Sequence, residues 1–164
     1  GRPVPPSARF CLALEDLQDP GNVGTLLRSA AAAGVEHVLL APTCAFAWSP
    51  KVLRAGQGAH FALNIVEGAD LPAFVASFAG TTVALCSEAK ASIYDADLRG
   101  PVAFLVGNEG AGLSAQLEKA AKLRLRIPMP GRAESLNAGV AGSIALFEVV
   151  RQRGVTLPKG GGHG

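Results

Sequence analysis

Short apolar runs alternate with segments of helical character along most of the chain. The apolar runs are nearly continuous, as expected of strands buried on both faces of a parallel sheet, and they lie at 11–14, 35–40, 63–66, 81–86, 102–106 and 123–127. The helical segments lie between and after them, at 22–33, 49–56, 71–78, 114–121 and 135–153. Strands that alternate with helices in this way favour an α/β fold, in which a mainly parallel sheet has helices on both faces.

The last helical segment has the clearest periodicity. Its large apolar residues recur every three or four positions and form one stripe along the helix, made of Leu136, Val140, Ile144, Phe147 and Val150. Gly154 follows the last turn and is a common type of helix terminator. The segment also contains Gly139 and Gly142, and each glycine costs a helix about 1 kcal/mol relative to alanine. We interpret these glycines as a sign that something packs close to this helix.

The chain has 164 residues, of which 49% are hydrophobic and 17% are charged. This size and composition predict one ordinary folded domain, and no internal repeat or interdomain linker interrupts the pattern. We expect a proline-rich leader tail at 1–9, the folded domain at 10–154 and a flexible tail at 155–164. No apolar run reaches the roughly 18 to 20 residues that cross a bilayer, so we expect no membrane span.

Cysteine and charge narrow the classes of function further. The cysteines, Cys11, Cys44 and Cys86, are widely spaced and form no C-x-x-C pair, and the histidines are scattered. We interpret the cysteines as reduced thiols of a cytoplasmic protein, and we expect no metal site. The net charge of +2 requires no charged partner, but residues 119–153 contain seven basic and two acidic residues. This segment could meet phosphates or could be a solvated face, and charge alone leaves both open.

The common signatures of nucleotide-binding enzymes and hydrolases are absent. The chain has no G-x-x-x-x-G-K-[ST] and no G-x-S-x-G motif, and the glycines at 107–112 do not have the order of a dinucleotide fingerprint. The sequence therefore does not support a P-loop nucleoside triphosphatase, a dinucleotide-dependent dehydrogenase or a serine hydrolase.

Three glycine- and amide-rich segments remain, and each follows a predicted strand. In the first, a turn at 19–21 precedes Asn22, which is a natural N-cap for the next helix. Arg28 lies on that helix and points away from its apolar side. The residues alone leave open whether Asn22 and Arg28 have a chemical role or are an ordinary cap and a surface arginine.

The second segment follows the predicted strand at 102–106 and combines three glycines with one carboxylate, Glu109. Glycines let a backbone approach a ligand closely, and open α/β sheets bind ligands beyond the carboxyl ends of their strands. A plain turn with a solvated Glu109 is the alternative. The third segment is a proline-rich loop after 123–127 that leads into the last helix. Ser135 can cap this helix, whereas Asn137 in its first turn has poor helix propensity and invites another explanation.

Taken together, the segments resemble the three signature motifs of the SpoU/TrmH family of RNA 2′-O-ribose methyltransferases, in the SPOUT superfamily. They match the N-x-G-x-x-x-R, G-x-E-x-x-G-L and I-P-M…S-L-N patterns in the family's order. The resemblance extends over 10–153 and includes the stretch at 49–55. One such motif is weakly specific, but three in order are highly specific.

The resemblance implies a SPOUT-type fold with a C-terminal trefoil knot, an obligate homodimer, and S-adenosylmethionine as methyl donor without a metal. The catalytic positions that it implies are Asn22, Arg28, Glu109, Ser135 and Asn137. Arg28 is expected to reach the site across the dimer interface. The residues expected around the cofactor are Gly107, Asn108, Glu109, Gly112, Ile127, Met129, Ser135, Leu136 and Asn137.

The implied reaction transfers a methyl group from S-adenosylmethionine to a ribose 2′-hydroxyl of RNA and leaves S-adenosylhomocysteine. Ribosomal RNA is favoured over transfer RNA because the 49–58 stretch resembles that of ribosomal members. The main alternative is a module that binds S-adenosylmethionine or RNA without methyl transfer, as the catalytic half of a longer protein. A SPOUT enzyme that modifies a base, and an unrelated doubly wound enzyme, are the others. Which nucleotide is modified, and which group accepts the hydroxyl proton, stay open.

Overall fold

A computed structural model of the chain describes residues 1–131 and 136–154. The strands are β1 (Phe10–Leu14), β2 (His37–Leu40), β3 (Asn64–Val66), β4 (Thr81–Leu85), β5 (Ala91–Ser92), β6 (Val102–Val106) and β7 (Leu123–Arg126). The α-helices are α1 (Pro20–Ala33), α2 (Pro50–Gly56), α3 (Leu71–Ser77), α4 (Ala115–Ala120) and α5 (Ala138–Arg153). Two short 3₁₀ helices, η1 (Ala59–Phe61) and η2 (Ile93–Asp95), complete the list for these ranges.

Within the described ranges, the seven strands form one sheet in the order β3-β2-β1-β6-β4-β7-β5, and every neighbouring pair is parallel. The sequence prediction of a mainly parallel α/β fold is therefore confirmed. Strand β5 was not predicted, because a strand of two residues is too short to give a hydrophobic pattern. Because the strands are parallel, the loops that follow β1, β2, β4, β6 and β7 all lie at the same edge of the sheet, the carboxyl edge.

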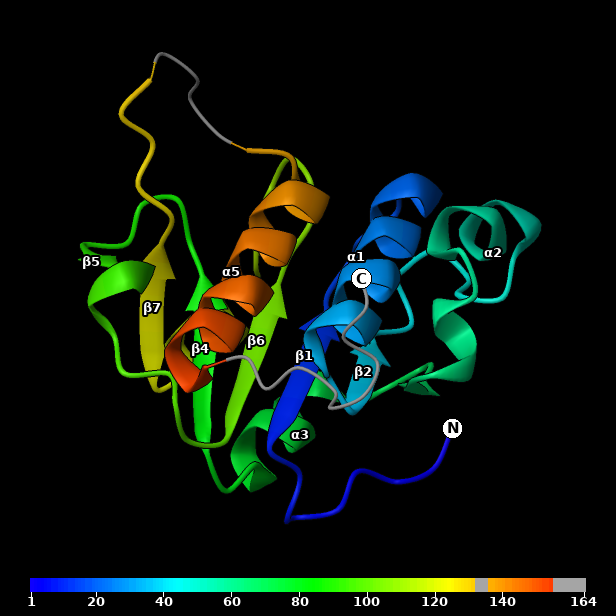
Figure 1. Cartoon of the computed structure of the whole chain (residues 1–164), viewed down its shortest axis with the longest axis horizontal. Coiled ribbons are helices and arrows are strands. Elements are labelled where there is room, and N and C mark those ends of the chain that lie inside the picture. The colour runs from blue at the N-terminus through cyan, green and yellow to red at the C-terminus, as the bar shows by residue number, and fades with distance from the viewer. Residues whose placement is uncertain (132–135, 155–164) are drawn as a thin grey trace, which may run out of the picture.

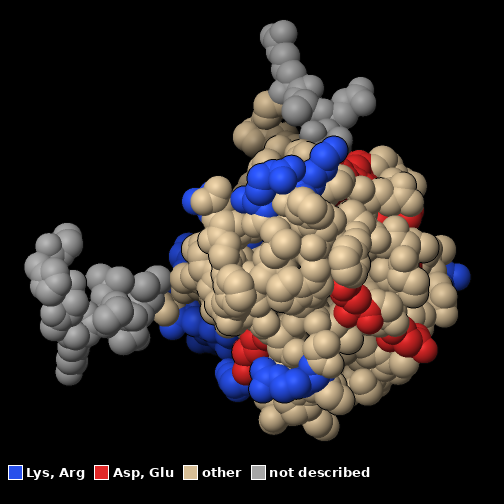
Figure 2. Space-filling view, turned by 90° about the vertical axis from the view of Figure 1, so that its right-hand side faces the viewer, with Lys and Arg blue, Asp and Glu red and all other residues tan. Residues whose placement is uncertain are grey.

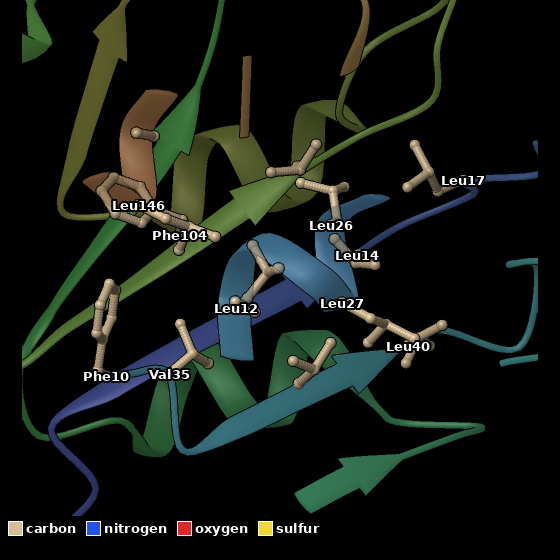
Figure 3. Packing of buried hydrophobic residues seen from close by; sticks show 14 of the residues in the cluster. Phe10, Leu12, Leu14, Leu17, Leu26, Leu27, Val35, Leu40, Phe104 and Leu146 are labelled. Atoms are coloured by element: carbon tan, nitrogen blue, oxygen red, sulfur yellow. The ribbon is translucent and has the colours of Figure 1, made fainter. Parts of the chain in front are cut away.

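Helices cover both faces of the sheet, as expected. Helices α1 and α5 lie side by side on one face and α3 lies behind the sheet (Figure 1). Alternate residues of β1 face opposite ways: Leu12 and Leu14 join the core cluster under α1 and α5, whereas Cys11 and Ala13 join the cluster under α3 and α4. Figure 3 shows the first cluster, where leucines of α1 pack against those of β1.

Helix α5 differs from the sequence prediction at its start and in the face that it buries. It begins at Ala138, and its N-cap is Asn137, whose side chain accepts a hydrogen bond from the Val140 amide at 3.2 Å. The predicted apolar stripe does not face the sheet, because Val140 and Phe147 are 46% and 43% exposed. The buried face is instead formed mainly by small and medium residues, Gly139, Gly142, Ala145, Leu146 and Val149.

Small residues on this face let α5 approach α1 closely. A Cβ atom on Gly142 would overlap with the side chain of Leu26 on α1. The hydroxyls of Ser29 on α1 and Ser143 on α5 are hydrogen-bonded at 2.7 Å. The glycines of α5 are therefore packing residues, as their unfavourable propensity indicated.

Residues 1–9 form no helix or strand, but Arg2 is held at the β3 edge of the sheet. The Arg2 amide donates to Asn64 Oδ1, and Asn64 Nδ2 donates to the Arg2 carbonyl, both at 2.8 Å. The division into leader, domain and tail stays a prediction, and the tail at 155–164 lies outside the described residues. The strand pairings do not establish the trefoil knot, which also stays a prediction. No helix in the described ranges is long and apolar enough to span a membrane.

Candidate active site

The loops that follow β1 and β6 are joined by hydrogen bonds at the carboxyl edge of the sheet. Asn108 Nδ2 donates to the backbone carbonyl of Asp16 at 2.9 Å. The Glu109 carboxylate accepts from the backbone amides of Asp19, at 2.7 Å, and Gln18, at 3.3 Å. The first and second sequence motifs are therefore in direct contact, although about 90 residues separate them.

The loop after β6 is also closed on itself. Asn108 Oδ1 accepts from the amides of Gly110 and Ala111, both at 2.9 Å, and the backbones of Asn108 and Gly112 form two hydrogen bonds. A Cβ atom on Gly107 would overlap with the backbone of Gly112, and Gly112 itself has φ of +75°. This tight turn requires glycine at both positions.

The Glu109 carboxylate is held in its charged form. Burial by itself would raise the pKa of this carboxyl, but hydrogen bonds from its own amide and from those of Asp19 and Gln18 outweigh that effect, so its pKa is lowered. The Asn22 side chain contributes to the same lowering. A carboxylate with a lowered pKa is a weak base, and its contacts favour a role in fixing the loop before α1.

The first turn of α1 differs from the sequence prediction. Its N-cap is Asp19, whose Oδ1 accepts from the Gly21 amide at 2.8 Å, and not Asn22. Asn22 lies inside the first turn and is buried. Because Asn22 is not needed as the cap, its burial calls for another explanation.

Gly139 on α5 supplies that explanation. A Cβ atom on this glycine would lie 3.1 Å from Asn22 Oδ1 and 3.0 Å from Asn137 Oδ1. The side-chain oxygens of Asn22, from the first motif, and Asn137, from the third, therefore both lie beside Gly139 on the α1–α5 boundary. Since Asn22 also interacts with Glu109 of the second motif, all three motifs converge.

A pocket opens beside this convergence, between the ends of β4, β6 and β7 and the start of α5. Of the residues predicted to surround the cofactor, seven line it, namely Gly107, Asn108, Glu109, Gly112, Ile127, Met129 and Leu136. Asn137 is not part of the lining but lies next to Gly139, while Ser135 falls outside the described residues.

Sequence reasoning missed the contribution of β4. Leu85, Cys86 and Ser87, at the end of this strand, also line the pocket. They could not be found from motifs, because only the strand order shows that β4 lies between β6 and β7. Burial raises the pKa of the Cys86 thiol to about 11, so this side chain is a neutral, weakly polar part of the wall.

The predicted catalytic arginine is not part of this pocket. Arg28 is exposed on α1 and is not among the residues that line the pocket within the described chain. The predicted basic region is partly occupied in structural contacts: Arg124 donates to the carbonyls of Glu118 and Ala121, at 2.9 and 3.1 Å, and Arg126 donates to the carbonyl of Lys90. Arg126 also lines the pocket. Among the described residues, no group of three or more His, Cys, Asp or Glu side chains could hold a metal ion.

Comparison with known proteins gives the class that this fold and pocket define, a SpoU-type methylase. The model of the SpoU rRNA Methylase family matches residues 9–147. The chain belongs to this family. It is 38% identical over 146 residues to the 23S rRNA (guanosine(2553)-2′-O)-methyltransferase RlmP of Bacillus subtilis strain 168, and the match covers 87% of this chain and 58% of that protein.

Solved structures agree. The SpoU methyltransferase AviRb of Streptomyces viridochromogenes, in complex with the cofactor AdoMet, is 32% identical with a TM-score of 0.82, over 92% of this chain and 60% of that one. A chain solved in work on 2-OH methylation of C/U34 on tRNA is 32% identical with a TM-score of 0.77, over 87% of this chain and 89% of that one. The chain thus spans somewhat more than half of the curated bacterial rRNA methyltransferases that it matches.

Proposed function

We propose that the chain catalyses transfer of a methyl group from S-adenosylmethionine to a ribose 2′-hydroxyl of RNA. The observation that supports this most directly is the convergence of Asn22, Glu109 and Asn137 beside one pocket at the carboxyl edge of the sheet. Open α/β sheets bind ligands at this edge. A family relative has been solved with AdoMet bound.

The pocket suits S-adenosylmethionine in its chemistry. The Leu85, Ile127 and Leu136 side chains offer an apolar wall for a flat heterocycle, and the glycine turn at 107–112 brings backbone polar groups to the rim. The bound cofactor would supply an activated methyl group on a positively charged sulfur. Gly107, Asn108, Gly112, Met129, Leu136 and, by resemblance, Ser135 and Asn137 are the residues that we propose hold it.

The reaction needs placement more than strong acid–base groups. As the 2′-oxygen bonds to the methyl carbon, the carbon–sulfur bond would break and the electron pair of that bond would stay on sulfur. The hydroxyl proton must also leave the 2′-oxygen. A guanidinium stays charged at neutral pH and is a poor base. We therefore propose that Arg28 binds the adjacent phosphate and stabilises the developing alkoxide, while a substrate phosphate or solvent accepts the proton.

A homodimer is part of the proposal. Arg28 is exposed on α1 and away from the pocket of its own chain, so a second copy would have to bring it to the reacting ribose. Helix α5, which packs on α1, exposes Val140 and Phe147 seven positions apart and therefore on the same side. An exposed apolar stripe of this kind suits burial against a second copy.

We propose ribosomal RNA as the substrate, with transfer RNA as the second candidate. The names of RlmP and of other bacterial relatives specify 23S rRNA, whereas a structural relative that this chain spans almost fully is described with tRNA. A cytoplasmic location also stays a proposal. The free thiols of Cys11, Cys44 and Cys86 are compatible with a reducing compartment.

The test is methyl transfer from radiolabelled S-adenosylmethionine to RNA, followed by alkaline hydrolysis. Methylation of a ribose blocks cleavage at that nucleotide, so the label is expected in alkali-resistant dinucleotides. Label in mononucleotides would indicate a base as the target and would refute the proposal. Binding of cofactor and RNA without label transfer would instead favour a binding module that lacks its own activity. Separate reactions with ribosomal and transfer RNA decide between the two substrates.

A further inference from the structure

The loop after β2, residues 41–49, exposes two aromatic side chains at the carboxyl edge of the sheet. Trp48, which is the one tryptophan of the chain, is 42% exposed, and Phe46 is 60% exposed. Large aromatic side chains usually bury most of their surface in the core. Two aromatic side chains exposed in one short loop therefore indicate a binding surface.

The Trp48 ring and the backbone of Ala47 are held in place by contacts with neighbouring residues. The Trp48 ring contacts the ring of His60, with centroids 4.8 Å apart. His60 is buried, and its Nε2 lies 2.6 Å from the Ala47 carbonyl, to which it donates a hydrogen bond. The Ala47 amide donates in turn to the Glu67 carboxylate at 2.9 Å. The position between the two aromatic residues is thus fixed from both sides, and little ordering would be needed on binding.

This loop is connected to the pocket through the neighbouring loops. The Ala45 amide donates to the Leu17 carbonyl at 2.8 Å, and the next two residues along, Gln18 and Asp19, donate to Glu109 at the pocket rim. Strand β2 lies next to β1, and β1 lies next to β6. With neighbouring strands about 4.8 Å apart, the loops after β2 and β6 begin about 10 Å apart along the same edge of the sheet.

Positive charge follows the aromatic residues directly. Ser49 caps α2, and Lys51 and Arg54, three positions apart on this helix, are both exposed. Figure 2 views the molecule from the α2 side and shows Lys and Arg side chains above a broad area without charged residues, with Asp and Glu side chains along its right-hand border. A surface that combines aromatic rings with nearby cations fits a single nucleic-acid strand, whose bases stack and whose phosphates need neutralising.

We propose that Phe46 and Trp48 form a stacking surface for unpaired RNA bases next to the nucleotide that enters the pocket, with Lys51 and Arg54 contacting the phosphates. This inference rests on the proposed RNA substrate and adds the residues that position it. A second copy of the chain is the less suitable occupant, because Lys51 and Arg54 border this surface, whereas the exposed stripe of α5 provides an uncharged one.

Trp48 provides its own probe because no other tryptophan contributes to the emission. A short single-stranded oligoribonucleotide is titrated into the protein at low and at high salt, and tryptophan fluorescence and the anisotropy of a labelled copy of the RNA are both recorded. Stacking should quench the fluorescence in parallel with binding, and high salt should weaken both. Binding without any change in tryptophan emission would overturn the proposal, as would the absence of RNA binding.

Variants separate stacking from other roles. Trp48→Ala and Phe46→Ala should each weaken RNA binding about tenfold, and Trp48→Phe, which keeps a ring, should retain most of the affinity. Tyr94→Ala is the matched control, because Tyr94 is an exposed aromatic residue near β5, at the opposite end of the sheet. Equal affinity in all four variants would overturn the proposal. A second copy of the chain would occupy the surface instead if tryptophan emission changed with protein concentration in the absence of RNA and Trp48→Ala sedimented as a smaller species. That result would also overturn the proposal.

Methyl transfer distinguishes this inference from the function on which it rests. If no label is transferred while RNA still quenches the Trp48 fluorescence, the stacking surface is supported and the proposed activity is refuted. If label is transferred with the same KM for RNA in Trp48→Ala and in the unchanged chain, the activity is supported and the stacking surface is refuted. Circular dichroism of each variant confirms that it is folded.

Discussion

Glu109 accepts a hydrogen bond from the Asp19 backbone amide at 2.7 Å, across about 90 residues of sequence. Asp19 is also the N-cap of α1, so this contact fixes the end of the helix that carries Asn22 and Arg28. The carboxylate of the second motif therefore positions the amide of the first. This relationship gives Glu109 a physical role that does not depend on acid–base chemistry.

Replacing Glu109 with glutamine should loosen the loop before α1 in a pH-dependent way. The pKa of Glu109 is lowered in the folded chain, so its contribution to stability is present above its unfolded pKa, near 4.5, and is lost as the pH falls through the folded value. Because Glu109 is exposed and solvent screens its contacts, we expect Glu109→Gln to reduce the free energy of unfolding by only about 0.5 kcal/mol at neutral pH. Urea unfolding at neutral and acidic pH measures this difference, which should shrink in acid. A difference that is independent of pH would contradict the assignment.

Gly107 should tolerate no side chain. A Cβ atom there would overlap with the backbone of Gly112 and Leu113, which cannot move aside without opening the turn. We expect Gly107→Ala to abolish measurable cofactor binding and to destabilise the fold by about 1 to 3 kcal/mol. Gly110→Ala is the control from the same turn, because the nearest atom to its Cβ would be 3.6 Å away. Calorimetric titration with S-adenosylhomocysteine compares the two, and similar binding by both would refute the packing argument.

Arg28 should affect turnover and leave cofactor binding unchanged. It is exposed and does not line the pocket of its own chain. We expect Arg28→Ala to lower the rate of methyl transfer by about 10² or more, as other electrostatic stabilisers do. Arg99→Ala is the control, since Arg99 is an exposed arginine whose partner is Asp97, 2.9 Å away. Loss of cofactor binding in Arg28→Ala, measured by calorimetry, would show that the division of roles is wrong.

The exposed stripe of α5 should hold two copies together. Phe147 is 43% exposed on this stripe, and a charge placed there would be buried in a dimer. We expect Phe147→Glu to sediment as a monomer and to lose methyl transfer, because Arg28 could then no longer reach the pocket of a second copy. Tyr94→Glu, on an exposed aromatic residue elsewhere, should remain dimeric. A Phe147→Glu protein that stays dimeric and active would place the interface somewhere else.

Hydrophobic pattern alone predicted most of the fold. The continuous apolar runs identified the buried strands because a parallel sheet covered on both faces requires apolar side chains on both sides of each strand. The pattern failed on α5, where Val140 and Phe147 form part of a regular stripe and yet face outward. Close packing against α1 favours Gly142 and Ala145 on the inner face, and a hydrophobicity pattern ranks such small residues too low.

Part of the candidate site could be predicted from the sequence. The motif residues at 107–112, Ile127 and Met129 do line one pocket, because each lies just after a strand of the same parallel sheet. The wall formed by Leu85 and Cys86 was not readable, since strand order is a property of the whole fold. The capping roles of Asp19 and Asn137 were also missed, because several adjacent polar residues could each have served as the cap.

Amide hydrogen exchange, measured by mass spectrometry with and without S-adenosylhomocysteine, tests most directly whether the strand-end loops form one cofactor site. We predict slower exchange on ligand addition in the segments at 15–19, 86–88, 107–114 and 127–131 and in the first turn of α5, with the segments at 41–49 and 95–101 unchanged. Protection confined to other parts of the chain, or none under conditions where calorimetry detects binding, would contradict the account.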